Sequence, residues 1–149
     1  MEMEKQYYYF PWAIEAYQGT NGRDIPEYKP VKIAHAVVTE GGRTLRMSGW
    51  PAIGKAGIVG KGDMAKQVTE ALNHCLRTVE EAGGTWDNVI HLMIYFTDRE
   101  KFWRDGLPAR SEFLNKHAKT DNRPCITAVG VPALMHPEML VEVEATAIL

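Results

Sequence analysis

Several signals that identify common protein classes are missing from this chain of 149 residues. No apolar run approaches the roughly 20 residues that a membrane-spanning helix requires. The formal net charge is only −2 with both signs interspersed, so no basic patch is available for nucleic acid. The N-terminus, Met-Glu-Met-Glu-Lys, is charged and lacks the apolar core of a signal peptide. We therefore expect a cytoplasmic protein whose partners are neither membranes nor nucleic acids.

Signals for metal or nucleotide chemistry are also scarce. The two cysteines, Cys75 and Cys125, are isolated and lack the spacing of metal ligands, and the five histidines share no such spacing. The glycine-rich segment 49–62 lacks the Lys-Ser/Thr ending of a phosphate-binding loop, and no G-x-G-x-x-G is present. We expect no metal site and no cofactor.

What is present is the pattern of an ordinary globular domain. Hydrophobic residues make up 45% and charged residues 24%, and the length suffices for a buried core. Apolar residues recur at three- and four-residue spacing from Asp63 to Gly83, which predicts a helix. A second helix is expected from Asp98, interrupted at residues 105–107 because Pro108 does not fit inside a helix, and continuing to residue 117. Strands are expected over residues 33–39, 44–48, 89–96 and in two closing segments after residue 123.

These elements follow the order β-β-α-β-α-β-β, which predicts an α+β fold with two helices on one face of a mixed sheet. The first two strands are expected to form a hairpin around Gly41-Gly42. The other face of such a sheet is bare, so self-association is the simplest way to bury it. Residues 1–30 are rich in aromatic residues and interrupted by Gly and Pro, and we expect an extension that packs on the domain of residues 31–149 or on a neighbouring subunit.

The last strand carries an unusual alternation. Val141, Val143 and Ala145 alternate with Glu142 and Glu144, so the two carboxylates share one face of the strand. Solvated charge on an outer face is one interpretation. A carboxylate that faces a cleft is the other.

A succession of short motifs also runs along residues 33–148. They are Ser48-Gly49, Asp63, Gln67, Ala71-Leu72-Asn73, Glu81-Ala82-Gly83, Tyr95, Thr97-Asp98, Val129-Gly-Val131 and Leu140-Val-Glu-Val-Glu-Ala145. This combination resembles the reactive-intermediate deaminase family, also called the Rid or YjgF-like family. The resemblance implies a chorismate-mutase-like fold, a homotrimer, and clefts between subunits where a small organic acid binds. The best-known members hydrolyse 2-imino or enamino acids to 2-oxo acids and ammonia without metal or organic cofactor.

The resemblance also implies roles for single residues. Glu142 matches the glutamate beside the reacting water and Gly49 matches the glycine of the site, so both are predicted to be catalytic. The tyrosine position falls on Ile33. The arginine position falls on Ile126 if Val129-Gly-Val131 sets the alignment, which we favour, and on Arg123 if Arg123-Pro-Cys125 sets it. The substrate-binding residues predicted in this way are Ser48, Trp50, Ile33, His35, Ile126, Arg123 and Ala128.

Two of these residues have two interpretations each. Trp50 serves either as a loop anchor or as a flat wall against a conjugated substrate. His35 has either a chemical role or, as is more usual for a single strand histidine, a structural one. Glu144 is assigned to structure.

Two functions follow. The first is cofactor-free hydrolysis of a small conjugated enamine or imine acid, of which 2-aminomuconate is an example. The second is a trimeric protein that binds a small ligand or has a regulatory role, without hydrolysis, which the unmatched arginine position favours.

Overall fold

A mixed β-sheet forms the centre of the protein in the computed structural model, which describes residues 2–12 and 33–149. Its strand order is β3 (Thr44–Arg46), β9 (Val141–Ile148), β7 (Val89–Phe96) and β8 (Cys125–Gly130), and β4 (Trp50–Pro51) also pairs with β9. Strand β7 runs parallel to β8 and antiparallel to β9. β9 is therefore an inner strand with neighbours on both sides.

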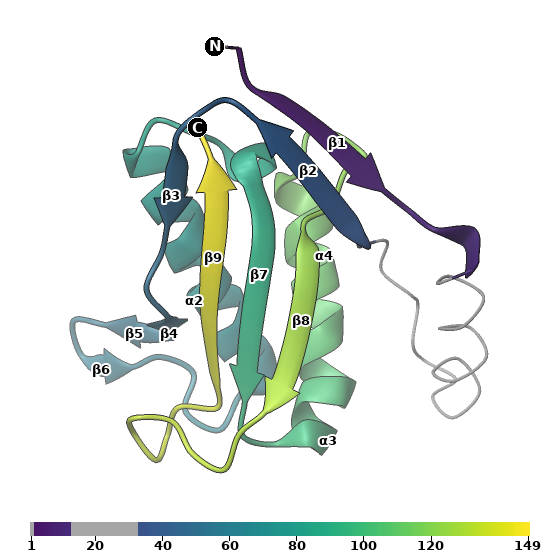
Figure 1. Ribbon diagram of the computed structural model, residues 1–149. Coiled ribbons are helices and arrows are strands. Elements are labelled where there is room, and N and C mark those ends of the chain that lie inside the picture. Colours follow the sequence, from purple (N-terminus) through teal and green to yellow (C-terminus); the bar gives the residue numbers. More distant parts are fainter. Residues whose placement is uncertain (1, 13–32) are drawn as a thin grey trace.

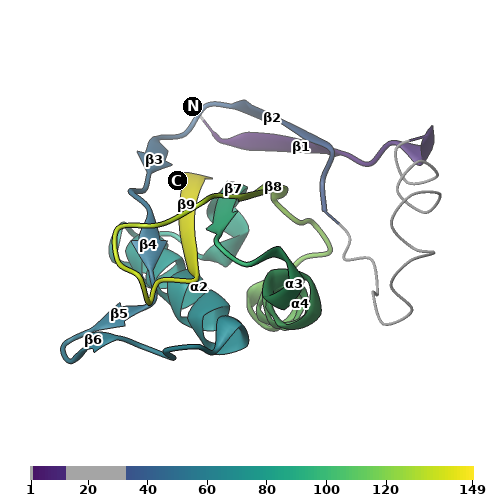
Figure 2. The same cartoon turned by 90° about the horizontal axis from the view of Figure 1, so that it is seen from below.

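Two helical segments cover one face of this sheet (Figure 1). The first is α2 (Met64–Glu81), and the second consists of α3 (Arg99–Lys101), the π-helical turn η2 (Phe102–Gly106) and α4 (Leu107–His117). The turned view in Figure 2 shows both on the same side of β9, β7 and β8. The core between the layers includes Leu72, Leu92, Ile94, Leu114 and Val143, all fully buried. The prediction of two helices on one face of a mixed sheet is confirmed.

Helix α2 has the ends that its sequence predicts. The Asp63 carboxylate caps the helix by accepting a hydrogen bond from Lys66 N at 2.9 Å. After the helix, Gly83 adopts a φ of 90°, which side chains disfavour, and the chain leaves the helical path there. Burial raises the pKa of the Cys75 thiol to about 12, in agreement with its predicted place in the core.

The prediction that residues 105–107 interrupt the second helix is wrong. The helix continues through a π turn, in which Leu107 N donates to Phe102 O, and Pro108 lies at the start of α4. Proline lacks an N–H and its ring collides with the preceding turn of an α-helix. The wider π turn accommodates it without ending the helix.

The predicted hairpin of the first two strands is also wrong. Gly41 and Gly42 do turn the chain, with φ of 72° and 76°. However, β2 (Ala36–Glu40) pairs with β1 (Glu4–Tyr8), whereas β3 pairs with β9. The partner strand of β2 comes from the N-terminal extension, which the local turn signal cannot reveal.

The β1–β2 ribbon lies over the sheet face that the helices leave uncovered (Figure 2). The Lys5 ammonium, which projects from this ribbon, donates to the backbone carbonyl of Asp87 at 2.7 Å. Strand β1 thus contacts β2 and, through Lys5, Asp87, while the expected boundary near residue 30 lies outside the described residues.

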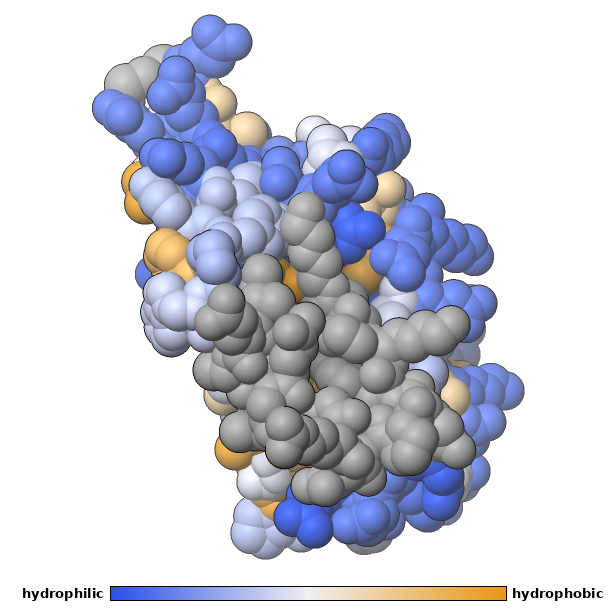
Figure 3. Space-filling model, turned by 90° about the vertical axis from the view of Figure 1, so that its right-hand side faces the viewer, coloured by the Kyte–Doolittle hydropathy of each residue, from blue (hydrophilic) through white to orange (hydrophobic). Residues whose placement is uncertain are grey.

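Two further features complete the fold. The glycine-rich segment contains the short strands β5 (Ile53–Gly54) and β6 (Gly57–Ile58), which pair with each other, and the one-turn η1 (Trp86–Asn88) precedes β7. In Figure 3 the visible described surface is mostly hydrophilic, with small and separate apolar areas. Within the described part of the chain, no helix has the length and apolar character needed to cross a membrane.

Candidate functional site

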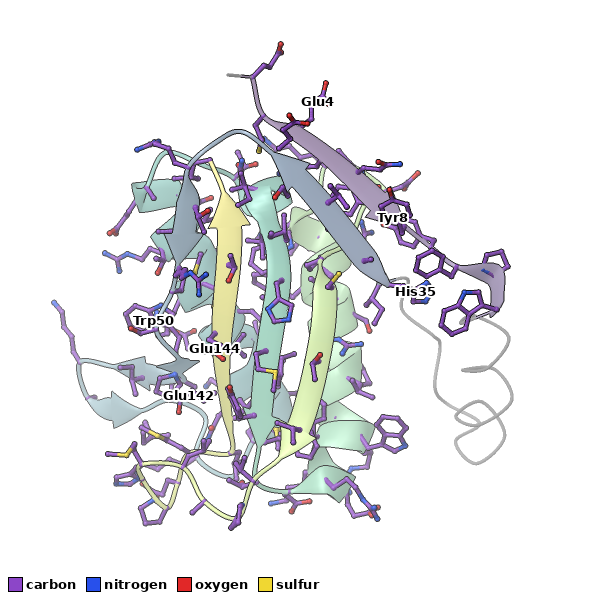
Figure 4. All side chains as sticks on the ribbon, in the orientation of Figure 1. Glu4, Tyr8, His35, Trp50, Glu142 and Glu144 are labelled. Atoms are coloured by element: carbon purple, nitrogen blue, oxygen red, sulfur yellow. The ribbon has the colours of Figure 1, made fainter. Side chains whose placement is uncertain are left out.

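The alternation in β9 places its two glutamates on the sheet face opposite the helices. Val141, Val143 and Ala145 are buried in the core, and Glu142 and Glu144 between them are half-buried. Figure 4 shows Glu142 and Glu144 on β9, close to Trp50 on β4. The predicted separation of valines and carboxylates is confirmed.

Gly49 packs directly against the side chain of Glu142. A Cβ built on Gly49 would overlap Glu142 Oε1 and lie 2.8 Å from Glu142 Cδ, closer than real Cβ atoms come. The φ of Gly49 lies outside the region that favours glycine, so the absence of a side chain is needed here for space alone. The two residues predicted to be catalytic are therefore neighbours, although they are far apart in the sequence.

The chain that carries Gly49 is irregular at this point. Arg46 pairs with Thr146 of β9, and Trp50 pairs with Val143. Trp50 lies four residues after Arg46, whereas Val143 lies only three residues from Thr146, so the chain that leads to β4 contains one extra residue. Such an extra residue is a β-bulge, a feature that re-aims the neighbouring backbone and is frequent beside active sites. Ser48, next to Gly49, is exposed.

The phenol of Tyr95 on β7 lies beside the two carboxylates. Its backbone pairs with Glu142, and its hydroxyl donates to Glu144 Oε1 at 2.7 Å. This hydrogen bond raises the pKa of Tyr95, with smaller contributions from burial and from the charges of Glu144 and Glu142. Sequence reasoning did not assign Tyr95 to the site, because only the pairing of β7 with β9 brings the two residues together.

The cations in the described part of the chain do not pair with these carboxylates. Within residues 2–12 and 33–149, no ion pair of Lys or Arg involves Glu142 or Glu144. The Arg123 guanidinium instead donates to the carbonyls of Thr120 at 2.8 Å and Asn122 at 3.0 Å, and to Asn115 Oδ1 at 3.1 Å. In this chain, Arg123 fastens the loop between α4 and β8.

Within one chain, Ile126 does not lie on the sheet face that carries Glu142. Ile126 pairs with the buried Leu92 and packs against the core, on the helix side of the sheet. Side chains alternate along a strand, so Ala128, which pairs with the buried Ile94, points to the same side and not to the carboxylates.

Within one chain, the contacts of Trp50 are those of a loop anchor. Its pairing partner is the buried Val143, it packs against the core, and its ring lies 5.1 Å from the ring of His74 on α2. His74 in turn lies 2.8 Å from the carbonyl of Ile53 through Nε2, which ties the loop to the helix.

His35 lies away from Glu142 (Figure 4), and Ile33 precedes His35 in the chain by two residues. Figure 4 places His35 beside Tyr8, beyond the β8 edge of the sheet, whereas Glu142 lies near β4. His35 Nδ1 accepts a hydrogen bond from Phe10 N at 2.7 Å, and the His35 and Phe10 rings stack at 5.9 Å. Within one chain, His35 has the structural role that was the alternative interpretation.

The described residues contain no group of His, Cys, Asp or Glu side chains suited to a metal ion. What the site offers is a carboxylate against a glycine backbone, next to a second carboxylate that is bonded to a phenol. This arrangement provides proton acceptors and donors without a fixed cation.

The architecture is that of a chorismate-mutase-like α+β protein, with the candidate site on the face away from the helices. The family model for endoribonuclease L-PSP matches residues 30–149, and the chain belongs to this family, which comprises the Rid and YjgF-like proteins. The resemblance inferred from the sequence is thereby confirmed.

Solved structures of family members agree with this assignment. A Rid-family protein of unknown function from Yersinia pestis is 29% identical, with 78% of this chain and 86% of that chain covered and a TM-score of 0.67. A Mycobacterium tuberculosis member of the YjgF/YER057c/UK114 family is 25% identical, covering 98% and 100%, with a TM-score of 0.59. TdcF of Escherichia coli, solved with bound serine, shares the fold at 22% identity, covering 80% and 92%, with a TM-score of 0.64. No curated protein matches the chain.

Gly49→Ala should reduce stability by about 1–3 kcal/mol, because the new methyl group overlaps the Glu142 side chain. In a Glu142→Ala background the same substitution should cost much less, since the overlapping atoms are gone. Denaturant unfolding of the two single variants and the double variant measures this coupling. Gly54→Ala, whose Cβ would meet only Val59 at 3.3 Å, is the matched control. Equal costs of Gly49→Ala in both backgrounds would contradict the packing described.

Tyr95→Phe should change the dependence of stability on alkaline pH. The pKa of Tyr95 is raised in the folded protein, so the stabilisation is present below the unfolded value near 10 and is lost as pH rises through the folded pKa. Tyr95→Phe should therefore remove part of the fall in stability above about pH 10. Denaturant midpoints from about pH 8 to about pH 11 measure it, and Glu144→Gln should weaken the same dependence. Identical slopes for wild type and Tyr95→Phe would refute the link.

Proposed function

We propose that the protein is a cofactor-free hydrolytic deaminase of a small enamine or imine carboxylic acid, including conjugated acids such as 2-aminomuconate. The contact between Gly49 and Glu142 carries the proposal, because it joins the two residues that the family resemblance assigns to chemistry. A half-buried carboxylate with no ion-pair partner among the described residues is available for proton transfer.

The reaction requires few protein groups. A proton added to the enamine carbon gives an iminium ion, water adds to the iminium carbon, and the resulting carbinolamine loses ammonia to leave a 2-oxo acid. Glu142 is suited to accept the proton of the attacking water and to return a proton to the substrate. The absence of a side chain at Gly49 leaves room for the Glu142 carboxylate against the backbone, which holds this carboxylate in place.

The described part of one chain does not bring a cation beside Glu142 to hold the substrate carboxylate. We propose that a second copy supplies it, in a homotrimer with sites between subunits. His35 and Arg123, which bond to other residues within one chain, and Ile33 would then reach the site of a neighbouring copy. In the structure of the Escherichia coli relative TdcF a serine is bound, which is consistent with a small amino-acid-like ligand.

The choice between a conjugated acid and a short imine as substrate is open to test. The sequence suggests Trp50 as a flat wall against a conjugated substrate and Ile126 as a second lining residue, but within one chain both side chains face the core. The argument for conjugation over a short imine therefore has no support from these two residues.

The alternative function is a protein that binds a small ligand without hydrolysis. The engagement of Arg123 by Thr120, Asn122 and Asn115 favours it, since these hydrogen bonds would compete with a substrate carboxylate for the guanidinium. The family description as an endoribonuclease suggests a third activity. A net charge of −2 and two carboxylates on the candidate face argue against RNA as the ligand.

Ammonia release from freshly generated 2-aminoacrylate, longer 2-imino acids and 2-aminomuconate tests the enzyme function. Glu142→Gln should lower the rate by about 100-fold or more, because a neutral amide cannot accept the proton. Gly49→Ala should also lower it, by displacing the carboxylate. Glu81→Gln, an exposed position on α2, is the control and should leave the rate unchanged. Absence of release above background with every substrate would favour the binding function.

Light scattering tests the assembly separately. The expected mass is about three times the 16.8 kDa of one chain. A stable monomer at micromolar concentration would exclude a site shared between copies.

A further inference from the structure

The strongest feature outside the site is a buried polar side chain in the first turn of α2. Gln67 is fully buried, and its amide makes three hydrogen bonds, all to backbone groups. Nε2 donates to Gly60 O at 3.1 Å and to Glu138 O at 2.9 Å, and Oε1 accepts from Leu140 N at 2.8 Å. A buried amide saturated in this way usually has a defined structural task, because each unmade bond would be costly.

Two of these bonds, those with Glu138 O and Leu140 N, fix the start of β9. Leu140 lies two residues before Glu142, and its N–H is held by Gln67 while its carbonyl accepts from Thr97 N at 3.0 Å. Leu140 is thus attached on one side to α2 and on the other to the end of β7. Because a slip of one residue would move Glu142 to the core side of the sheet, this attachment secures the face on which the carboxylate lies.

The third bond, from Gln67 Nε2 to Gly60 O, fixes the segment that carries Gly49. Gly60, the other acceptor of Nε2, is adjacent to Val59, whose N–H donates to Ala52 O at 2.9 Å. Ala52 follows Pro51, which pairs with Glu142. Gln67 therefore connects the two pieces of chain that bring Gly49 and Glu142 together, although it contacts neither residue itself.

We propose that Gln67 is a positioning residue for the Gly49–Glu142 pair, holding the β9 start and the 51–60 segment at the spacing that puts the Glu142 carboxylate against Gly49. The effect of Gln67 on catalysis rests on the proposed deaminase function, but its effect on the position of the Glu142 carboxylate does not.

The geometric test uses Gln67→Met, which keeps the length of the side chain and removes all three hydrogen bonds. The stability coupling between Gly49→Ala and Glu142→Ala is measured by denaturant unfolding, in the wild type and in the Gln67→Met background. The coupling should disappear in Gln67→Met, because the carboxylate no longer lies over Gly49. An unchanged coupling overturns the proposal, whatever the protein catalyses. If Gln67→Met does not fold, the same cycle in Gln67→Glu decides the question.

The kinetic test applies if the wild type releases ammonia. Gln67→Met should lower kcat by about 100-fold with little change in KM, as a displacement of about 1 Å in a catalytic group does. Gln67→Glu should recover activity relative to wild type as pH falls, because a neutral carboxyl again has a hydrogen to donate to a carbonyl. Val79→Ala, a buried position in the last turn of the same helix, should reduce stability and leave kcat unchanged. Equal kcat losses in Gln67→Met and Val79→Ala overturn the positioning role, while a wild type without activity refutes only the deaminase function.

Discussion

The pairing of β9 with its neighbours is the constraint on which the rest of the structure depends. This strand pairs with β7 on one side and with β3 and β4 on the other, and its valines and alanines fill the core beneath α2. Because successive side chains alternate, burial of Val141 and Val143 forces Glu142 and Glu144 onto the opposite face. The position of the carboxylates is therefore a consequence of core packing.

The candidate site results from a second segment that meets this strand. The bulge between Arg46 and Trp50 brings Gly49 against Glu142, and the Trp50 ring secures the same segment from the helix side. Gln67 joins both segments to α2 through three hydrogen bonds. The three hydrogen bonds of Gln67 thus control the position of the Glu142 carboxylate on the face of the sheet away from the helices.

Sequence patterns with a short period predicted much of the fold. The three- and four-residue spacing after Asp63 and the alternation after Leu140 both describe how a residue relates to its near neighbours, and both were confirmed. The face on which Ile126 lies was missed, since it depends on the register between β7 and β8. The partner of β2 was missed for a similar reason, because β1 is separated from it by a long stretch of chain. The π turn was missed because the presence of Pro108 predicts a disturbed helix but does not indicate whether the helix ends or widens into a π turn.

The sequence by itself predicted the two helical segments with the strands around them and identified the family, and it singled out Gly49 and Glu142 as candidates, because local periodicity and short motifs carry that information. Only the tertiary structure decided that these two residues touch, that Tyr95 bonds Glu144, and that Trp50 and Ile126 face the core. The physical reason is that contacts across a sheet depend on strand register and on bulges, which are set by the packing of distant segments and leave no local signal in the chain.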